Sequence, residues 1–276
     1  MPPPYRVRAR NTATASTNKI HDDEVARRFG FGGGLVPGVD VYAYLTRPVV
    51  ARWGRRWLGA GTMEARFLAP VYDGEEVEVE SRTLGDEDPS GDLTTELTLR
   101  NRAGETCAVA TAGLANRPPT APDPHAWPDA PLPSLPPPAS AATLVAGSAL
   151  GPVETVFEAS LGRAYLDDVG ETLDLYASGA PAHPGWLLRR ANRVLAANVA
   201  LGPWIHVASE VRHLATVGDG DALTTRANVL GTFERKGHRF VDLDVLTVSD
   251  RAGPVQRVHH TAIYEPRPVG APGAAN

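Results

Sequence analysis

The sequence contains a single cysteine, Cys107, among its 276 residues. One thiol cannot form a disulfide within the chain, and no cluster of cysteines is present to hold a metal ion. We therefore expect no metal site. The hydrophobic content of 42% is ample for a packed core without such cross-links.

Long apolar runs are missing as well. No stretch reaches the roughly 18 apolar residues that a membrane-spanning helix needs. The first ten residues, MPPPYRVRAR, have no apolar segment behind their charges, whereas a secretory signal requires one. We expect a cytoplasmic protein with no membrane partner.

An excess of positive charge is also absent, because the formal net charge is −5. Nucleic-acid-binding domains usually carry a basic face, so we expect no nucleic-acid partner. Charged residues make up 21% of the chain, which is typical of globular proteins and argues against wholesale disorder.

Proline is concentrated in one place, with ten prolines in residues 118–138. Proline has no backbone N–H and a fixed φ, so this segment is typical of a semi-extended spacer. It predicts an N-terminal domain at 1–117, a linker at 118–139 and a C-terminal domain at 140–276.

The two halves share a motif. EARFLAPVYDGEEV (64–77) and EVRHLATVGDGDAL (210–223) are identical at seven positions with a constant offset of 146 residues. Pro37-Gly38 and Pro184-Gly185 precede the two motifs in the same order, and each opens a helix-like run. Several matches in one order indicate an internal duplication.

The pattern of elements is the same in both halves. Short extended segments at 5–9 and 153–157 precede long helices at about 39–53 and 186–200, with a short helix at 21–29. Pro48 predicts a kink or break in the first long helix. Residues 76–81 and 241–248 alternate polar and apolar side chains, as antiparallel strands do, and 86–92 and 234–238 are turns. Long helices followed by antiparallel strands predict an α+β fold.

The most informative segment is Ser-Thr-Asn-Lys-Ile-His-Asp-Asp at 16–23, followed by GFGGGLVPG at 30–38. It resembles the motif of MaoC-like proteins, which include R-specific enoyl-CoA hydratases. The resemblance implies a double hot-dog fold, with two antiparallel sheets each wrapped around a central helix. The matching positions are Asn18, Ile20, His21, Asp23, Ala26, Gly30, Phe31 and Gly38.

The resemblance also implies roles for these residues. His21 would be the general acid or base, Asn18 would orient the reacting groups, and the Gly38 amide would bind the thioester oxygen with help from the helix dipole. The catalytic aspartate of the family falls on Ser16, which cannot act as a base at neutral pH. The family histidine before the helix glycine falls on Pro37. Further candidates for substrate binding are Gly34, Val36, Asp23, His183 and Trp186.

The function implied is hydration or dehydration of a 2-enoyl or 3-hydroxyacyl group on coenzyme A or a carrier protein. The first half would carry the chemistry and the second would shape the acyl tunnel. Because of Ser16, three alternatives stay open: an attenuated or specialised hydratase, a non-catalytic acyl-thioester binding protein, and a hot-dog thioesterase. A homodimer also stays open.

Other chemistry-bearing residues have plainer interpretations. Asn18 and His21, taken without the family, fit an ordinary turn before a helix. GFGGG lacks the GxGxxG order of a dinucleotide loop, so we expect no cofactor. His206 and His213 are interpreted as ordinary strand residues, and His259 and His260 as neighbours on opposite sheet faces. The arginines at 52, 55, 56, 189, 190 and 193 are interpreted as solvated helix faces, with binding of CoA phosphates as the lesser alternative.

Overall fold

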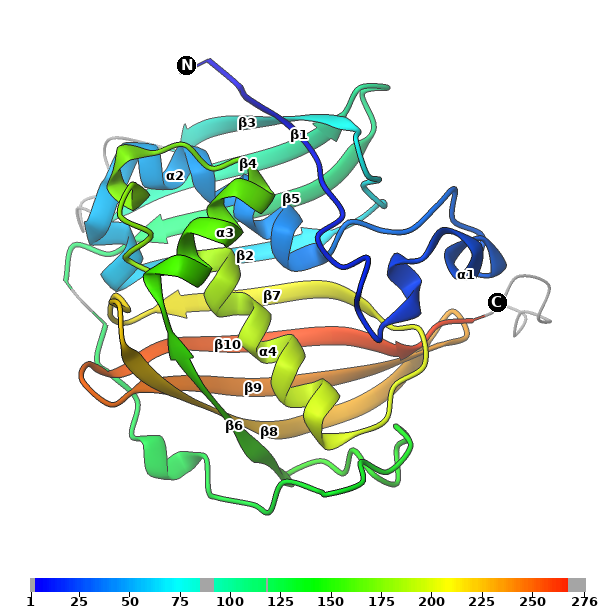
Figure 1. Ribbon diagram of the computed structural model, residues 1–276. Helices are drawn as coiled ribbons and strands as arrows, with labels where there is room; N and C mark the ends of the chain where they lie inside the picture. The colour runs from blue at the N-terminus through cyan, green and yellow to red at the C-terminus, as the bar shows by residue number, and fades with distance from the viewer. Residues whose placement is uncertain (1–2, 85–91, 118, 268–276) are drawn as a thin grey trace.

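The computed structural model describes residues 3–84, 92–117 and 119–267. Within these ranges one antiparallel sheet of ten strands runs in the order β1-β3-β4-β5-β2-β7-β10-β9-β8-β6. The helices α2, α3 and α4 lie over one face of this sheet (Figure 1). The colour change along the sheet in Figure 1 shows that the first half of the chain forms one side and the second half the other.

The predicted order of elements is confirmed in both halves. The first half consists of β1 (Tyr5–Arg8), a 3-10 turn (Lys19–His21), α1 (Asp23–Arg28), α2 (Gly38–Ala60), β2 (Gly61–Phe67), β3 (Glu76–Leu84), β4 (Leu93–Asn101) and β5 (Thr106–Leu114). The second half consists of β6 (Ala149–Phe157), α3 (Ala159–Val169), a 3-10 turn (Asp174–Tyr176), α4 (Pro184–Asn198), β7 (Ile205–His213), β8 (Asp221–Arg235), β9 (His238–Ser249) and β10 (Gly253–Glu265).

The halves have the same topology and meet in a pseudo-two-fold arrangement. The strand order β1-β3-β4-β5-β2 in one half corresponds to β6-β8-β9-β10-β7 in the other. The two sheets join edge to edge through antiparallel pairing of β2 with β7, in which Glu64 lies opposite Glu210. These two glutamates are also equivalent in the sequence repeat, as expected where a duplicated strand pairs with its own copy.

The repeated Asp-Gly step makes the same contacts twice. Asp73 accepts a hydrogen bond from the Asn11 amide at 2.8 Å, and Asp219 accepts one from the Ala159 amide at 2.7 Å. The glycine that follows has a positive φ in both halves, 73° at Gly74 and 79° at Gly220, which favours glycine. The predicted duplication is therefore confirmed by contacts as well as by topology.

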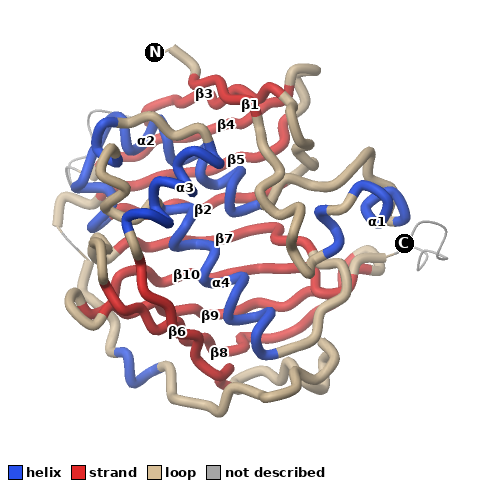
Figure 2. The backbone as a smooth tube through the Cα atoms, in the orientation of Figure 1, coloured by secondary structure: helices blue, strands red, loops and turns tan. Residues whose placement is uncertain are grey.

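Figure 2 shows the helices covering one face of the sheet. Buried side chains of α2, α4 and the strands form one core cluster. On β2, Met63 and Ala65 are buried while Glu64 and Arg66 are exposed, so the alternation of the sequence gives the strand one apolar face. The side chains of Tyr42 and Trp57, both on α2, are fully buried. Burial of each large apolar side chain stabilises the fold by about 1.5–3 kcal/mol.

The break in α2 is not at the predicted position. The backbone stays helical at Pro48, and the non-helical residue is Gly54, with φ 58° and ψ −146°. This region of backbone space is open almost only to glycine, so the chain breaks where a Cβ is absent. Proline at 48 removes one backbone donor without ending the helix.

The proline-rich segment packs against the second half. Trp127 is buried and its indole Nε1 donates a hydrogen bond to the Asp244 carbonyl at 2.9 Å. Asn228 Nδ2 donates to the Ala126 carbonyl at 3.0 Å. In Figure 1 the segment runs along the lower edge of the molecule, below β8 and β9. The domain boundaries at 117 and 140 stay a prediction.

Of the two predicted turns, that at 234–238 is confirmed as the β8–β9 hairpin, where Lys236 and Gly237 have positive φ. Residues 86–91 of the other turn lie outside the described residues. In the described part of the chain, no helix is both long and apolar enough to cross a membrane.

Candidate active site

A cavity of about 220 Å³ opens at the amino end of α2, and we call it the apolar pocket. Both halves contribute to its walls, since β7 and the end of β10 face α2 and the 18–38 segment across it. Its lining residues are Asn18, Ile20, His21, Phe31, Leu35, Val36, Pro37, Gly38, Val41, Phe67, Leu68, Ala69, Pro70, Val71, Asn192, Trp204, Ile205, His206, Val207, His238 and Ile263.

His21 is held in one protonation state and orientation. Its Nδ1 lies 2.7 Å from the Leu35 carbonyl, and a carbonyl can only accept, so Nδ1 carries the proton and Nε2 keeps its lone pair. Burial lowers the pKa of His21 below its usual value, although the Leu35 hydrogen bond opposes this shift. A neutral imidazole whose Nε2 keeps its lone pair is suited to accept a proton.

Asn18 joins the two halves beside His21. Its Oδ1 accepts from the Trp204 amide at 3.1 Å, and its Nδ2 donates to the Trp204 carbonyl at 2.9 Å. The Asn18 Nδ2 atom also lies 3.4 Å from His21 Nε2. Asn18 therefore orients a segment of the second half as well as the imidazole, which its sequence position alone does not reveal.

Ser16 lies beside a second cavity of about 350 Å³, the polar pocket, which shares Asn18, His21, Pro37, Asn192 and Trp204 with the apolar pocket. The Ser16 hydroxyl accepts a hydrogen bond from the Asn18 amide at 3.1 Å. The other lining residues of the polar pocket are Thr12, Ala13, Ala15, Thr17, Val39, Arg189, Arg193 and Ala196. His21 thus faces an apolar cavity on one side and a polar one on the other.

Gly38 is the first residue of α2 and lines the apolar pocket. Its amide belongs to the first turn, where N–H groups have no partner within the helix and the helix dipole favours negative charge. The equivalent glycine of the second half, Gly185, is closed off, because a Cβ there would collide with the Tyr165 hydroxyl. Only the helix start of the first half is therefore available to a ligand.

His206 is a pocket residue that the sequence interpretation missed. It is buried on β7, and its Nδ1 would lie 3.0 Å from a Cβ placed on Gly38. Its Nε2 lies 2.8 Å from the Ser209 hydroxyl, which lies 3.2 Å from His260 Nδ1. No local signal separates this histidine from an ordinary strand residue, since it reaches the site only through the pairing of β7 with β2.

Among the predicted substrate-binding residues of the first half, Val36 lines the apolar pocket, whereas Gly34 and Asp23 do not. Asp23 is exposed and accepts a hydrogen bond from the Gly34 amide at 2.8 Å. A Cβ on Gly34 would collide with the His21 carbonyl, so glycine is needed for this close approach. Both residues shape the loop that carries His21 toward α2.

The two candidates of the second half lie away from both pockets. His183 caps α4, its Nδ1 accepting from the Gly185 amide at 3.1 Å, and its Nε2 lies 3.7 Å from Glu171. Trp186 is buried against Phe157, with ring centroids 4.8 Å apart. Their contacts are those of a helix cap and a core residue.

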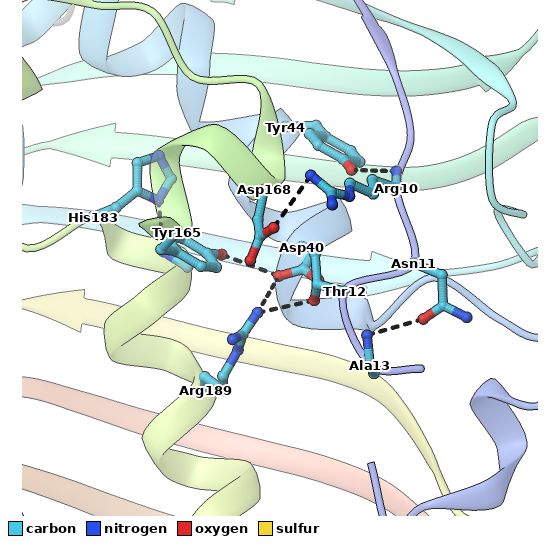
Figure 3. Close-up of polar contacts among 11 residues, drawn as sticks. Arg10, Asn11, Thr12, Ala13, Asp40, Tyr44, Tyr165, Asp168, His183 and Arg189 are labelled. Atoms are coloured by element: carbon cyan, nitrogen blue, oxygen red, sulfur yellow. Dashed lines mark hydrogen bonds and ion pairs between the residues drawn. The ribbon is translucent and has the colours of Figure 1, made fainter. Parts of the chain in front are cut away.

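A buried polar cluster fixes the start of α2 against the second half. Arg189 of α4 lies 2.9 Å from Asp40 Oδ1, Tyr165 of α3 donates to the same oxygen at 3.2 Å, and Thr12 donates to Oδ2 at 2.6 Å. Figure 3 shows these side chains pointing toward Asp40 from separate elements. Asp40 is fully buried, so breaking this network would leave a charge without water or partner. Arg189 is thus an ion-pair residue, and the solvated interpretation of it is wrong.

Within the described ranges, no group of three or more His, Cys, Asp or Glu side chains comes together in a way that could hold a metal ion. The polar groups at the two pockets include the neutral imidazole of His21, the Asn18 side chain, the Ser16 hydroxyl and the Gly38 amide. This set suits acid–base chemistry on a polarised carbonyl compound.

The sequence matches no protein-family model and no curated protein. Solved structures do match. A protein named as a MaoC domain dehydratase from Chloroflexus aurantiacus superimposes with a TM-score of 0.65 at 14% identity, covering 95% of this chain and 93% of that one.

Two further matches extend the comparison. A Mycobacterium tuberculosis protein described as having a double hot-dog fold, and as essential for bacterial survival during infection, has a TM-score of 0.58 at 19% identity, over 94% of this chain and 93% of that one. A protein named as a thioesterase from Novosphingobium aromaticivorans has a TM-score of 0.50 at 10% identity, over 84% and 88% of the two chains.

Proposed function

The chain has the double hot-dog fold of MaoC-like proteins, and on that premise we propose that it is an acyl-thioester hydratase or dehydratase. Its substrate would be a 2-enoyl or 3-hydroxyacyl group carried by coenzyme A or by a carrier protein. Proteins of this fold also include ones named as thioesterases, so the acyl thioester is the common ligand class.

One observation carries the proposal: His21 and Gly38, at the amino end of α2, line the same cavity. A thioester oxygen near Gly38 would lie at the positive end of a helix dipole. The acyl chain would then extend along apolar walls formed by side chains such as Phe31, Phe67 and Ile263.

The reaction follows from these positions. In hydration, the water oxygen forms a bond to C3 of the enoyl group while His21 Nε2 accepts the water proton. The electron pair of the C2=C3 bond moves toward the thioester oxygen, where the Gly38 amide stabilises the developing charge. His21 then returns the proton to C2, so that one water molecule has been added; dehydration is the reverse.

Turnover of crotonyl-CoA tests this proposal, by following the loss of enoyl absorbance. His21→Ala should lower the rate about a hundredfold or more, because one positioned acid–base group contributes a factor of this size. His125→Ala is the matched control, since His125 is exposed in the proline-rich segment away from both pockets. Equal rates in wild type and His21→Ala would move the chemistry to another residue.

The second candidate is a non-catalytic acyl-thioester binding protein. Ser16 favours it, since the serine hydroxyl accepts from the Asn18 amide and supplies no carboxylate beside His21. Tight binding of crotonyl-CoA without loss of absorbance and without free thiol would identify this function. A steady release of free thiol would instead identify a thioesterase.

A further inference from the structure

We propose that His206, a residue of the second half, donates its Nδ1–H to the thioester carbonyl oxygen beside the Gly38 amide. This inference rests on the proposed function, because it assigns a second carbonyl-binding group to the same pocket. It makes the carbonyl site a composite of both halves of the duplicated chain.

The position of His206 carries the inference. The residue is 6% exposed, and in the described part of the chain its Nδ1 has no hydrogen-bond partner. That atom would lie 3.0 Å from a Cβ on Gly38, so it borders the first residue of α2. A buried polar atom without a hydrogen-bond partner destabilises the folded protein, so Nδ1 indicates a ligand atom that forms the missing hydrogen bond.

The ring of His206 cannot easily turn away from this position. On one side, the Phe67 ring of β2 contacts it edge to face, with ring centroids 4.8 Å apart. The His260 ring of β10, the other strand that pairs with β7, has its centroid 4.3 Å away. The Asn18 hydrogen bonds to Trp204 hold the backbone two residues upstream. A donor fixed before the substrate arrives needs no reorganisation during the reaction.

The hydrogen-bond chain favours the tautomer with a proton on Nδ1. If His260 Nδ1–H donates to Ser209 and the Ser209 hydroxyl donates to His206 Nε2, then the proton of His206 is on Nδ1, beside Gly38. His260 Nε2, which is buried and has no partner, is then a lone pair. The opposite chain would place the unpaired N–H on His260 Nε2, and His260 lines neither the apolar nor the polar pocket, so no ligand atom there could accept from it.

His206 also remains neutral. Burial and the neighbouring His260 lower the pKa of His206 well below its usual value. A neutral imidazole still donates one hydrogen bond, and it can polarise a carbonyl without bringing a desolvated charge into the site. Removal of one donor of this kind costs about 100- to 1,000-fold in rate.

Two substitutions test the roles of the two ring nitrogens of His206 separately. In His206→Asn the side-chain amide can place an N–H near the position of Nδ1. In His206→Gln the longer side chain reaches the Nε2 position and the Ser209 hydroxyl, but leaves no donor beside Gly38. The midpoint temperature of thermal unfolding shows whether both variants fold as stably as wild type.

The readout is the infrared carbonyl stretch of a bound butyryl-CoA analogue, in which CH₂ replaces the thioester sulfur and the carbonyl carbon is ¹³C. This ketone has no C2=C3 double bond that could be hydrated and no thioester bond that could be hydrolysed. We expect a shift to lower frequency on binding to wild type and to His206→Asn, and a smaller shift with His206→Gln. Crotonyl-CoA hydration by His206→Gln should fall about 100- to 1,000-fold.

The outcomes distinguish this inference from the proposed function. A carbonyl shift of the same size in His206→Gln would overturn the role of His206, whatever the turnover. If the carbonyl shift is present in wild type and lost in His206→Gln, but wild type does not turn over crotonyl-CoA, the role of His206 is supported and the hydratase proposal is wrong. Failure of the ketone to bind wild type would overturn both. If His206→Gln does not fold, Ser209→Ala replaces it, because loss of the Nε2 partner should weaken the shift; an unchanged shift would count against the inference.

Discussion

Ser16 stands where MaoC-like hydratases carry their catalytic aspartate, and its hydroxyl cannot accept a proton from water at neutral pH. We expect Ser16→Asp to raise crotonyl-CoA hydration by about tenfold to a thousandfold, the range of one positioned acid–base group. The carboxylate can keep the hydrogen bond from the Asn18 amide that Ser16 accepts at 3.1 Å. Initial rates of absorbance loss measure the gain.

Thr14→Asp is the matched control for Ser16→Asp, because Thr14 is exposed on the same loop and lines neither pocket. Its rate should stay close to that of wild type. A folded Ser16→Asp protein with no gain over Thr14→Asp would mean that the pocket is not shaped for hydration, and the binding protein would become the leading candidate.

Single residues also mark the limit of sequence interpretation. The motif at 16–23 and the segment 30–38 that follows it predicted Asn18, His21 and Gly38, and all three line the apolar pocket, because their spacing is local. His206 could not be predicted, since it reaches Gly38 through sheet pairing between residues far apart in the chain. His183 resembled a site residue because it precedes Pro-Gly, yet its imidazole is engaged in capping α4.

Among the elements, α2 shows how one glycine determines where a helix breaks. We expect Gly54→Ala to lower the free energy of unfolding by about 1–3 kcal/mol, because an L side chain is strained at φ 58°. Gly59→Ala on the same helix should instead raise it by about 0.5–1 kcal/mol, since a Cβ there meets open space. Urea denaturation measures both values; effects of the same sign would contradict the described break.

Helices and strands were predicted best where polar and apolar residues recur at regular spacing in the sequence. The polar–apolar alternation of 76–81 and 241–248 appears as β3 and β9. The break in α2 was assigned to Pro48 because proline is the commoner helix breaker, whereas the backbone conformation at Gly54 depends on how the end of the helix meets β2. Tertiary packing of this kind is not encoded in a local pattern.

At the scale of the whole molecule, the duplicated halves differ in structure at the starts of their long helices. Gly38 borders a cavity, whereas Gly185 lies against Tyr165 and α2. The second half supplies β7 and the end of β10 as one wall of that cavity. The division into a chemical half and a half that shapes the acyl tunnel stays a prediction. The proposed function therefore predicts one acyl-thioester site per chain.

Buried histidines couple the stability of the whole fold to pH. Burial lowers the pKa of His213 to about 3, with a smaller contribution from His183, and burial lowers that of His260 to about 3. In the unfolded chain these groups titrate near 6.5. Between these values the unfolded state binds more protons, so stability is present above about pH 6.5 and is lost as the pH falls toward 3.

We expect His213→Gln to reduce this pH dependence by about one proton, or about 1.4 kcal/mol per pH unit between pH 4.5 and 6. The nearest groups are the Tyr42 hydroxyl, 3.4 Å from His213 Nε2, and the Trp57 ring, 4.6 Å away between centroids. Urea denaturation across this range gives the slope, with the exposed His125→Gln as control. An unchanged slope in His213→Gln would show that this histidine is protonated in the folded state.

The most direct measurement is a crystal structure with a non-hydrolysable acyl-CoA analogue bound. We expect the carbonyl oxygen within hydrogen-bond distance of the Gly38 amide, with C2 and C3 of the acyl group facing His21 Nε2 and the chain in the apolar pocket. An analogue bound outside this pocket, or one whose carbonyl points away from Gly38, would contradict the assignment of an acyl-thioester site to the start of α2.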